Sequence, residues 1–210
     1  MTGTVLAAII GLTITLGCPT ICRILPAPDD EPTSPYLTLA TWRFATATGL
    51  LATALSWLVT QRIPAPYWPI WLVISSVGVL AVCIDHATCW LPKTLTHTST
   101  AIILTALPIV AVSGHLPWSV AGRALLAGLA ARSLFWVLWR LGAGLGFGDV
   151  RLVLVCGIGA GLFSWPMVLV ALFAATLLAL VLAVTIYRGR RAIPYGPGLL
   201  IGTVLACALL

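Results

Sequence analysis

Residues 166–187 read PMVLVALFAATLLALVLAVTIY, a run without a single charged side chain. A helix rises about 1.5 Å per residue, so this run is long enough to cross the ~30 Å hydrocarbon core of a bilayer. The rest of the chain has the same character, because 60% of its 210 residues are hydrophobic and 8% are charged. A soluble domain carries about 25% charged residues. The composition therefore excludes a disordered chain and a cytosolic enzyme, and it predicts a polytopic membrane protein.

Polar or Pro/Gly-rich breaks divide the apolar sequence into eight candidate membrane spans. They cover residues 3–22, 38–60, 68–84, 97–113, 118–139, 150–164, 166–187 and 195–210. The sixth and eighth are shorter than the ~20 residues that a spanning helix needs, so a count of seven stays open. No soluble domain or strand-like alternation is visible. We expect an all-α bundle of transmembrane helices in which residues 1–210 form one membrane-embedded domain.

Basic residues favour one set of connections between these spans. The odd-numbered connections hold or border Arg23, Arg43, Lys93, Arg140, Arg151, Arg188, Arg190 and Arg191. The even-numbered connections border Arg62 and Arg123. The positive-inside rule then places the odd connections in the cytoplasm and the N-terminus outside. The net charge of +6 is thus explained by orientation and contact with membrane lipids, and it indicates no nucleic-acid partner.

The N-terminal span has no charge before Arg23, whereas a cleaved secretion signal has its positive charges ahead of the apolar stretch. We therefore expect a retained first helix. The six cysteines show no zinc-site spacing and are interpreted as buried apolar side chains.

Acidic residues are rare enough to be informative one by one. Asp29, Asp30 and Glu31 stand together in a Pro-rich connection and are interpreted as a solvated turn. Asp85 and Asp149 each stand alone at the edge of an apolar run, where a single Asp can also serve simply as a helix cap. Both belong to odd connections, so both are expected at the same membrane face.

Two carboxyl groups brought close together share a proton, because they do not both ionise easily. One can then act as a general base on water while the other, protonated, donates to a carbonyl oxygen. That division of roles is aspartic protease chemistry. The run of residues 142–149, GAGLGFGD, supports this hypothesis, because repeated glycine interrupts a helix and lets another backbone approach the Asp.

Four segments in order resemble those of a known family. Gly146-Phe147-Gly148-Asp149 is similar to the G-x-G-D signature of intramembrane aspartyl proteases, and the wider chain resembles the type IV prepilin peptidases. The segments are RILP at 23–26, IDHATCWLP at 84–92, GFGDVRL at 146–152 and IPYGP at 193–197. Arg151 stands where the family often has Lys, and Tyr195 where it has Phe.

The resemblance implies a membrane aspartic endopeptidase of the bacterial plasma membrane. It would cleave the leader of prepilin or pseudopilin substrates at the cytoplasmic face, with Asp85 and Asp149 as the catalytic pair and no cofactor or metal. Residues expected to support the site or bind substrate are Gly146, Gly148, Arg151, Pro194, Gly196 and Pro197. The first connection is short, so the chain resembles a short form without the zinc-binding, methylation-linked region.

Two alternatives stay open. A G-x-G-D protease with other substrates would share the same catalytic pair. A non-catalytic membrane protein, either a proton-coupled transporter or an assembly subunit, would use intramembrane acids differently. His86 is expected either to tune the neighbouring Asp85 or to be merely interfacial, and Arg132 either to face the bundle or to reach the interface. The sequence assigns no oligomeric state.

Overall fold

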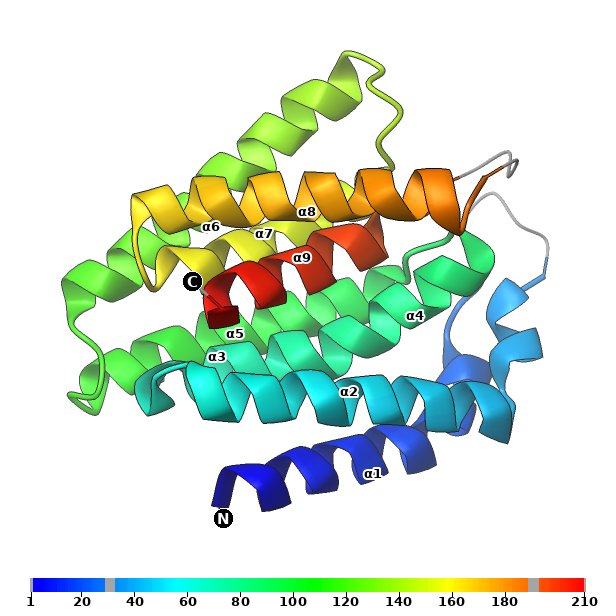
Figure 1. The fold of residues 1–210 in the computed structure, drawn as a ribbon, viewed down its shortest axis with the longest axis horizontal. Coiled ribbons are helices and arrows are strands. Elements are labelled where there is room, and N and C mark those ends of the chain that lie inside the picture. The colour runs from blue at the N-terminus through cyan, green and yellow to red at the C-terminus, as the bar shows by residue number, and fades with distance from the viewer. Residues whose placement is uncertain (1, 29–32, 189–192, 210) are drawn as a thin grey trace.

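A computed structural model describes residues 2–28, 33–188 and 193–209, and within these ranges all regular structure is helical (Figure 1). The α-helices are α1 Thr2–Ile24, α2 Trp42–Arg62, α3 Trp68–Val73, α4 Val79–Thr88, α5 Lys93–Val112, α6 Trp118–Arg140, α7 Phe147–Gly161, α8 Trp165–Thr185 and α9 Gly196–Leu209. Short 3₁₀ turns, η1 Pro35–Leu39 and η2 Ala65–Tyr67, precede α2 and α3. A π-helical turn, η3 Ile74–Gly78, joins α3 to α4 without a break. The all-α fold is confirmed.

Five helical stretches are long and apolar enough to cross a membrane. They are α1, the continuous stretch Ala65–Thr88, α5, α6 and α8. Large apolar side chains such as Leu12 on α1 and Phe173 on α8 are exposed on the outside of the bundle, at 60% and 71%. Exposed apolar surface of this extent suits contact with lipid. The chain is a multi-pass membrane protein.

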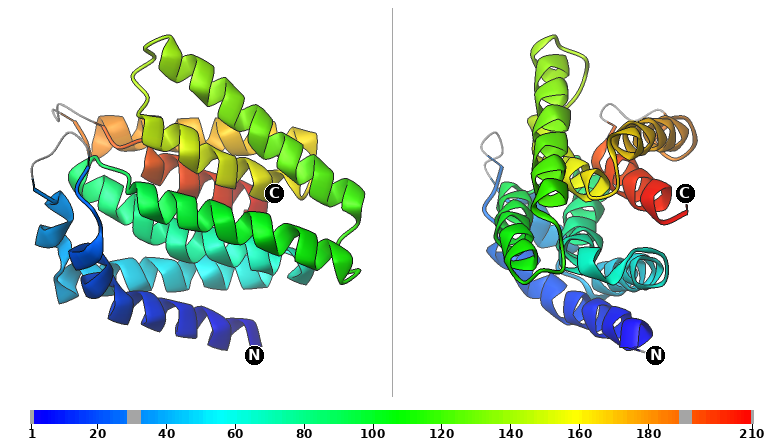
Figure 2. Two further views of the ribbon diagram at one scale, coloured as in Figure 1. Left: turned by 180° about the vertical axis from the view of Figure 1, so that it is seen from behind. Right: turned by 90° about the vertical axis from the view of Figure 1, so that its left-hand side faces the viewer.

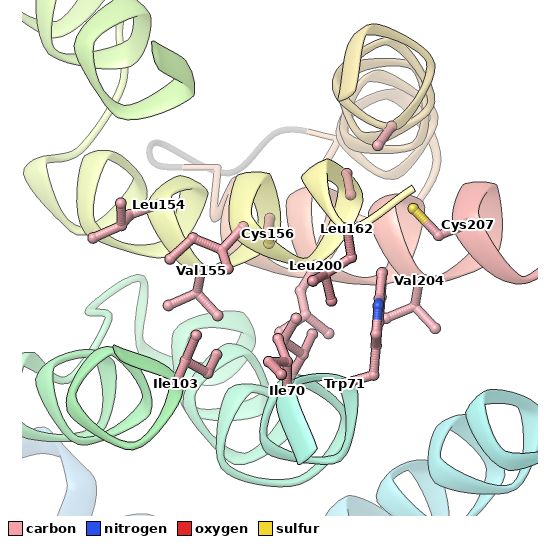
Figure 3. Packing of buried hydrophobic residues seen from close by; sticks show 14 of the residues in the cluster. Ile70, Trp71, Ile103, Leu154, Val155, Cys156, Leu162, Leu200, Val204 and Cys207 are labelled. Carbon is pink, nitrogen blue, oxygen red and sulfur yellow. The ribbon is translucent and has the colours of Figure 1, made fainter. Parts of the chain in front are cut away.

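Helices α7, of 15 residues, and α9, of 14 residues, form the centre of the bundle. With the exception of the half-buried Arg151, every residue from Asp149 to Gly161 on α7 is buried. Figure 3 shows side chains of α7 and α9, among them Val155 and Leu200, packed against Ile70 and Trp71 of α3 and against α5. Surrounding helices therefore shield the helices that the sequence predicts to be short.

Small residues let the central helices approach their neighbours closely. A Cβ atom added to Gly157 would lie 2.9 Å from the Cα atom of Gly128 on α6. One added to Gly202 on α9 would lie 2.5 Å from the Cα atom of Ala175 on α8. Helix packing in membranes depends on such small residues, because an apolar side chain is hardly more stable against another helix than against lipid.

The connections alternate between the two ends of the bundle. In Figure 1 the α1–α2, α4–α5 and α8–α9 connections lie at the right-hand end, and the α2–α3, α5–α6 and α7–α8 connections lie at the left. The connection from α6 to α7 descends on the right-hand side (Figure 1). The structure therefore separates odd from even connections, as eight consecutive spans require.

The observed boundaries differ from the predicted spans by no more than four residues. The third span continues through Thr88, so Asp85 lies inside the last turn of α4 and not beyond the helix end. The second helix begins at Trp42 because the 3₁₀ turn Pro35–Leu39 and the cap Thr41, whose side chain accepts a bond from the Phe44 N–H, come first. Asp29, Asp30, Glu31, Arg190 and Arg191 lie outside the described residues.

Arg123 has a structural role that its place near an even connection did not suggest. Its guanidinium group donates to the carbonyl oxygens of Gly161, Leu162 and Phe163 at 2.9, 2.8 and 2.8 Å. These carbonyls belong to the last residue of α7 and the two residues that follow it, and they would otherwise lack intrahelical partners. Arg123 of α6 thereby caps the central helix. By contrast, Arg132 is exposed on α6 and does not face the bundle interior.

Candidate active site

The four segments that carry the resemblance meet around one cavity of about 860 Å³. It lies at the end of the bundle where the odd connections gather. Its walls comprise residues 25–28 after α1, Tyr36 of η1, Asp85 of α4, residues 89–94, Gly144, residues 146–149, Arg151 and residues 193–195. Segments separated by more than a hundred positions in the sequence are thus brought together by the helix packing.

Asp85 occupies the last turn of α4 and is 5% exposed. The backbone N–H of Gly196, at the start of α9, donates to its Oδ2 atom at 3.2 Å. The helix ends at Thr88, and the next residue, Cys89, has a left-handed backbone with φ of 58° and donates its N–H to the Asp85 carbonyl oxygen. The turn sends the chain along the cavity wall toward α5.

Asp149 is the third residue of α7 and is 7% exposed. The Gly146 N–H donates to its Oδ2 atom at 3.0 Å, and the Asp149 N–H donates to the Gly146 carbonyl oxygen at 3.0 Å. This reciprocal pair starts the helix. Gly142 and Gly144, both at positive φ, form the preceding loop, which confirms that glycines interrupt the helices before the Asp.

The two carboxyl groups line the same cavity, and the charge of Asp149 acts electrostatically on Asp85. Each is held through its Oδ2 atom by a backbone N–H from a glycine. This arrangement brings together the two residues that the sequence predicts as a pair.

Arg151 lies near Asp149, two positions further along α7. Its guanidinium carbon is 5.8 Å from the centre of the Phe147 ring, and its positive charge acts on the Asp149 carboxyl group. Asp149 also lies at the amino end of α7, where the helix dipole is positive. Both features favour a negative charge at this position, and they act against the cost of burying that charge.

Tyr36 is a site residue that sequence reasoning missed. Its side chain is 3% exposed and reaches the cavity from η1. Burial raises the pKa of Tyr36 to about 12; the charge of Arg151 opposes this shift and the carboxylate of Asp85 adds to it. The phenol therefore stays neutral and can donate a hydrogen bond. In the sequence it is one aromatic residue in a Pro-rich connection, with no spacing that relates it to either Asp.

Most of the supporting residues predicted from the sequence line the cavity of the two acids, and two do not. Gly146, Gly148, Arg151 and Pro194 line the cavity. Gly196 is not among the lining residues but contacts Asp85 directly, whereas Pro197 faces a different cavity.

Glycine at positions 148 and 196 is required by close contacts. A Cβ atom at Gly148 would lie 2.8 Å from the Cβ atom of Leu91. One at Gly196 would lie 2.7 Å from the Oδ2 atom of Asp85. Both glycines therefore bring a backbone against a segment that carries or flanks an Asp.

His86 and five of the six cysteines do not line this cavity, whereas Cys89 does. The Nδ1 atom of His86 is 2.6 Å from the Tyr187 hydroxyl, and neither residue lines the Asp85 cavity. Four of the cysteines are buried and two are half-buried. Over residues 2–28, 33–188 and 193–209, no three His, Cys, Asp or Glu side chains are grouped to hold a metal ion.

The model of the type IV leader peptidase family matches residues 72–184, more than half of the chain. The matched region includes both Asp85 and Asp149 and leaves out the segments at 23–26 and 193–197. No curated protein and no solved structure matches the chain.

Proposed function

The chain belongs to the type IV leader peptidase family, and from that premise we propose that it is an aspartic endopeptidase with Asp85 and Asp149 as its catalytic pair. Its substrates are prepilin-like proteins, and it removes their leader peptides at the cytoplasmic face of the plasma membrane. No metal or other cofactor takes part in this chemistry.

One observation carries the proposal. Two buried acids, distant in sequence, open onto one cavity together with every segment that resembles the prepilin peptidases. The cavity lies at the end of the bundle that the charge bias assigns to the cytoplasm. A proton-coupled transporter would also use intramembrane acids, but transporters are typically built from internal repeats with matching broken helices. The segments around Asp85 and Asp149 are unlike each other, which favours the peptidase.

The surroundings of the two acids suggest their separate roles. Asp149 is near the positive charge of Arg151 and at the amino end of α7, so it is the ionised general base. Asp85 lies at the carboxyl end of α4, where the dipole is negative, and beside the charge of Asp149, so it is the protonated acid.

The reaction then proceeds in two balanced steps. Asp149 takes a proton from a water molecule while the oxygen of that water bonds to the scissile carbonyl carbon. At the same time Asp85 gives its proton to the carbonyl oxygen. When the tetrahedral intermediate collapses, the carbon–nitrogen bond breaks. Asp149 gives its proton to the leaving amine, and Asp85 recovers one from the intermediate hydroxyl. Both acids return to their starting states.

Other residues of the cavity suit an extended peptide. The glycines at 144, 146 and 148 present backbone with no side chain in the way. The neutral Tyr36 hydroxyl can donate to a substrate carbonyl oxygen. We assign these groups to holding the substrate backbone against the two carboxyl groups.

The test is co-expression with candidate prepilin-like proteins that carry short leaders, scored by the mass of the product. Wild-type enzyme is expected to remove the leader, while the Asp149→Asn variant, present at the same level in the membrane, is not. Substrates left intact by the wild-type enzyme across the whole panel would favour a protease with other substrates or a non-catalytic protein.

A further inference from the structure

A second cavity, of about 320 Å³, lies between α2, α4, α8 and α9. Its walls are almost entirely apolar and are formed by Phe44, Ala47, Thr48, Leu51, Val82, Cys83, His86, Leu182, Ile186, Tyr187, Pro197 and Ile201. None of these residues lines the cavity of the two acids. The preceding mechanism makes no use of it.

The second cavity shares a wall with the proposed active site. On α4, Asp85 lines the active-site cavity and the next residue, His86, lines the second one. At the start of α9, Tyr195 lines the first and Pro197 the second, with Gly196 bonded to Asp85 between them. The two spaces are therefore separated by the contact between α4 and α9 that holds a catalytic group.

The second cavity runs from the active-site end of the bundle toward its middle. Its residues on α2 are 44, 47, 48 and 51, which form one stripe of a helix over a length of about 10 Å. These positions lie near the start of α2, and the residues on α4 and α8 lie near the ends of those helices. The cavity thus begins level with the two acids and descends by about two helical turns.

A buried polar group lies in this apolar wall. Thr48 is 1% exposed, and its hydroxyl finds no oxygen or nitrogen partner among the described residues. It lies beside the Cys83 thiol, which is a weak hydrogen-bonding group. A buried hydroxyl without a good partner is costly, and a bound molecule with a polar group could satisfy it. A lipid tail offers no such group.

We propose that this cavity receives the apolar segment of the substrate that follows the scissile bond. The inference rests on the proposed peptidase function and deepens it. A substrate that is extended across the two acids must return to helix as it enters the membrane, and the first N–H groups of that helix have no intrahelical partners. The Thr48 hydroxyl can accept a hydrogen bond from one of these N–H groups, while the apolar wall contacts the apolar side chains of the substrate. The cavity thereby sets which bond lies over Asp85 and Asp149.

The experiment compares two substrates in detergent. The long one keeps the leader and the complete apolar segment; the short one is a soluble peptide that ends four residues after the scissile bond. Ala47 is exposed at the cavity mouth, so Ala47→Phe fills it without displacing the core. Ala101→Phe is the matched control, because Ala101 is an exposed alanine on α5. Helix α5 lies across the bundle from α8 and α9 (Figure 2).

We expect Ala47→Phe to lower the ratio of kcat/KM for the long substrate to that for the short one by about tenfold or more, since apolar contacts are lost only by the long substrate. Ala101→Phe keeps the wild-type ratio. An unchanged ratio in Ala47→Phe would overturn the inference. Wild-type enzyme that cleaves neither substrate would instead refute the proposed peptidase function.

A second measurement does not depend on the fold of the filled variant. A photo-crosslinking phenylalanine analogue is placed at position 47 or 101 in the inactive Asp149→Asn enzyme, which is then irradiated with the long substrate. The inference predicts a crosslink from position 47 to the residues just after the scissile bond, and none from position 101. Crosslinks from position 47 to lipid alone would contradict it.

Discussion

Gly196→Ala changes a single contact of Asp85, one of the two acids proposed to be catalytic. The added Cβ atom would lie 2.7 Å from the Oδ2 atom of Asp85, whereas the other atoms near it are at 3.4 and 3.5 Å. Ordinary van der Waals contact begins at 3.4 Å, so the Asp85 carboxyl group must move by about 0.7 Å. The same movement lengthens the 3.2 Å hydrogen bond that the Gly196 N–H donates to it.

A displacement approaching an ångström at a reacting group costs about 10²-fold in rate. We therefore expect Gly196→Ala to lose about 10²-fold in kcat for leader cleavage, and Gly196→Val to lose more. The backbone of Gly196 is not in the left-handed region, so alanine fits its conformation. Alanine is also more favourable than glycine in a helix by up to about 1 kcal/mol, which offsets part of the steric cost. Insertion and thermal stability should change little.

The assay is prepilin cleavage by purified enzyme in detergent, with the thermal unfolding midpoint measured alongside. Gly122→Ala is the control, because a Cβ atom added at Gly122 on α6 meets nothing within 4 Å. Wild-type activity in Gly196→Ala would refute the argument that this glycine positions Asp85. An equal loss of activity and of stability would show that the motif serves folding alone.

Three further predictions follow from other parts of the structure. Arg123→Met removes three hydrogen bonds to the carbonyls that end α7 and should lower the free energy of unfolding by about 3 kcal/mol, whereas the exposed Arg132→Met should leave the unfolding midpoint unchanged. Tyr36→Phe removes a neutral donor from the cavity and should lower kcat/KM about tenfold with no change in protein level, and undiminished cleavage would remove Tyr36 from the substrate site. Reporters fused after residue 30 or 190 should indicate the cytoplasm and one at 115 the exterior; the reverse pattern would place both acids at the outer face.

The sequence predicts the helices well because apolar runs of membrane length have few alternatives. Where boundaries differ, a local interaction decides. Pro35 begins a 3₁₀ turn that delays α2, and the left-handed Cys89 ends α4 later than the apolar run alone suggests. The continuous helix through the π turn at Ile74–Gly78 shows that a short irregularity need not divide a span.

The candidate site is only partly predictable from the sequence, because tertiary packing places some of its residues. Asp85, Asp149 and their glycines stand out because charge and helix-breaking residues are rare in such a chain. Tyr36 and Arg123 gain their roles from tertiary packing, which brings η1 to the cavity and α6 to the end of α7. Such packing leaves no periodic pattern in the sequence. For Pro197 the motif predicts a place beside the two acids, but its position on the turn of α9 directs it to the second cavity.

The most direct test of the account is cleavage of a prepilin by the Asp85→Asn, Asp149→Asn and double variants, with an immunoblot of each enzyme in the membrane. Asparagine keeps the size of the side chain but cannot exchange a proton in the reaction. Each single change should abolish cleavage at a protein level near that of wild type, and the double change should be hardly worse, because groups that act as a unit are not additive. Wild-type processing by either single variant would contradict the two-aspartate mechanism.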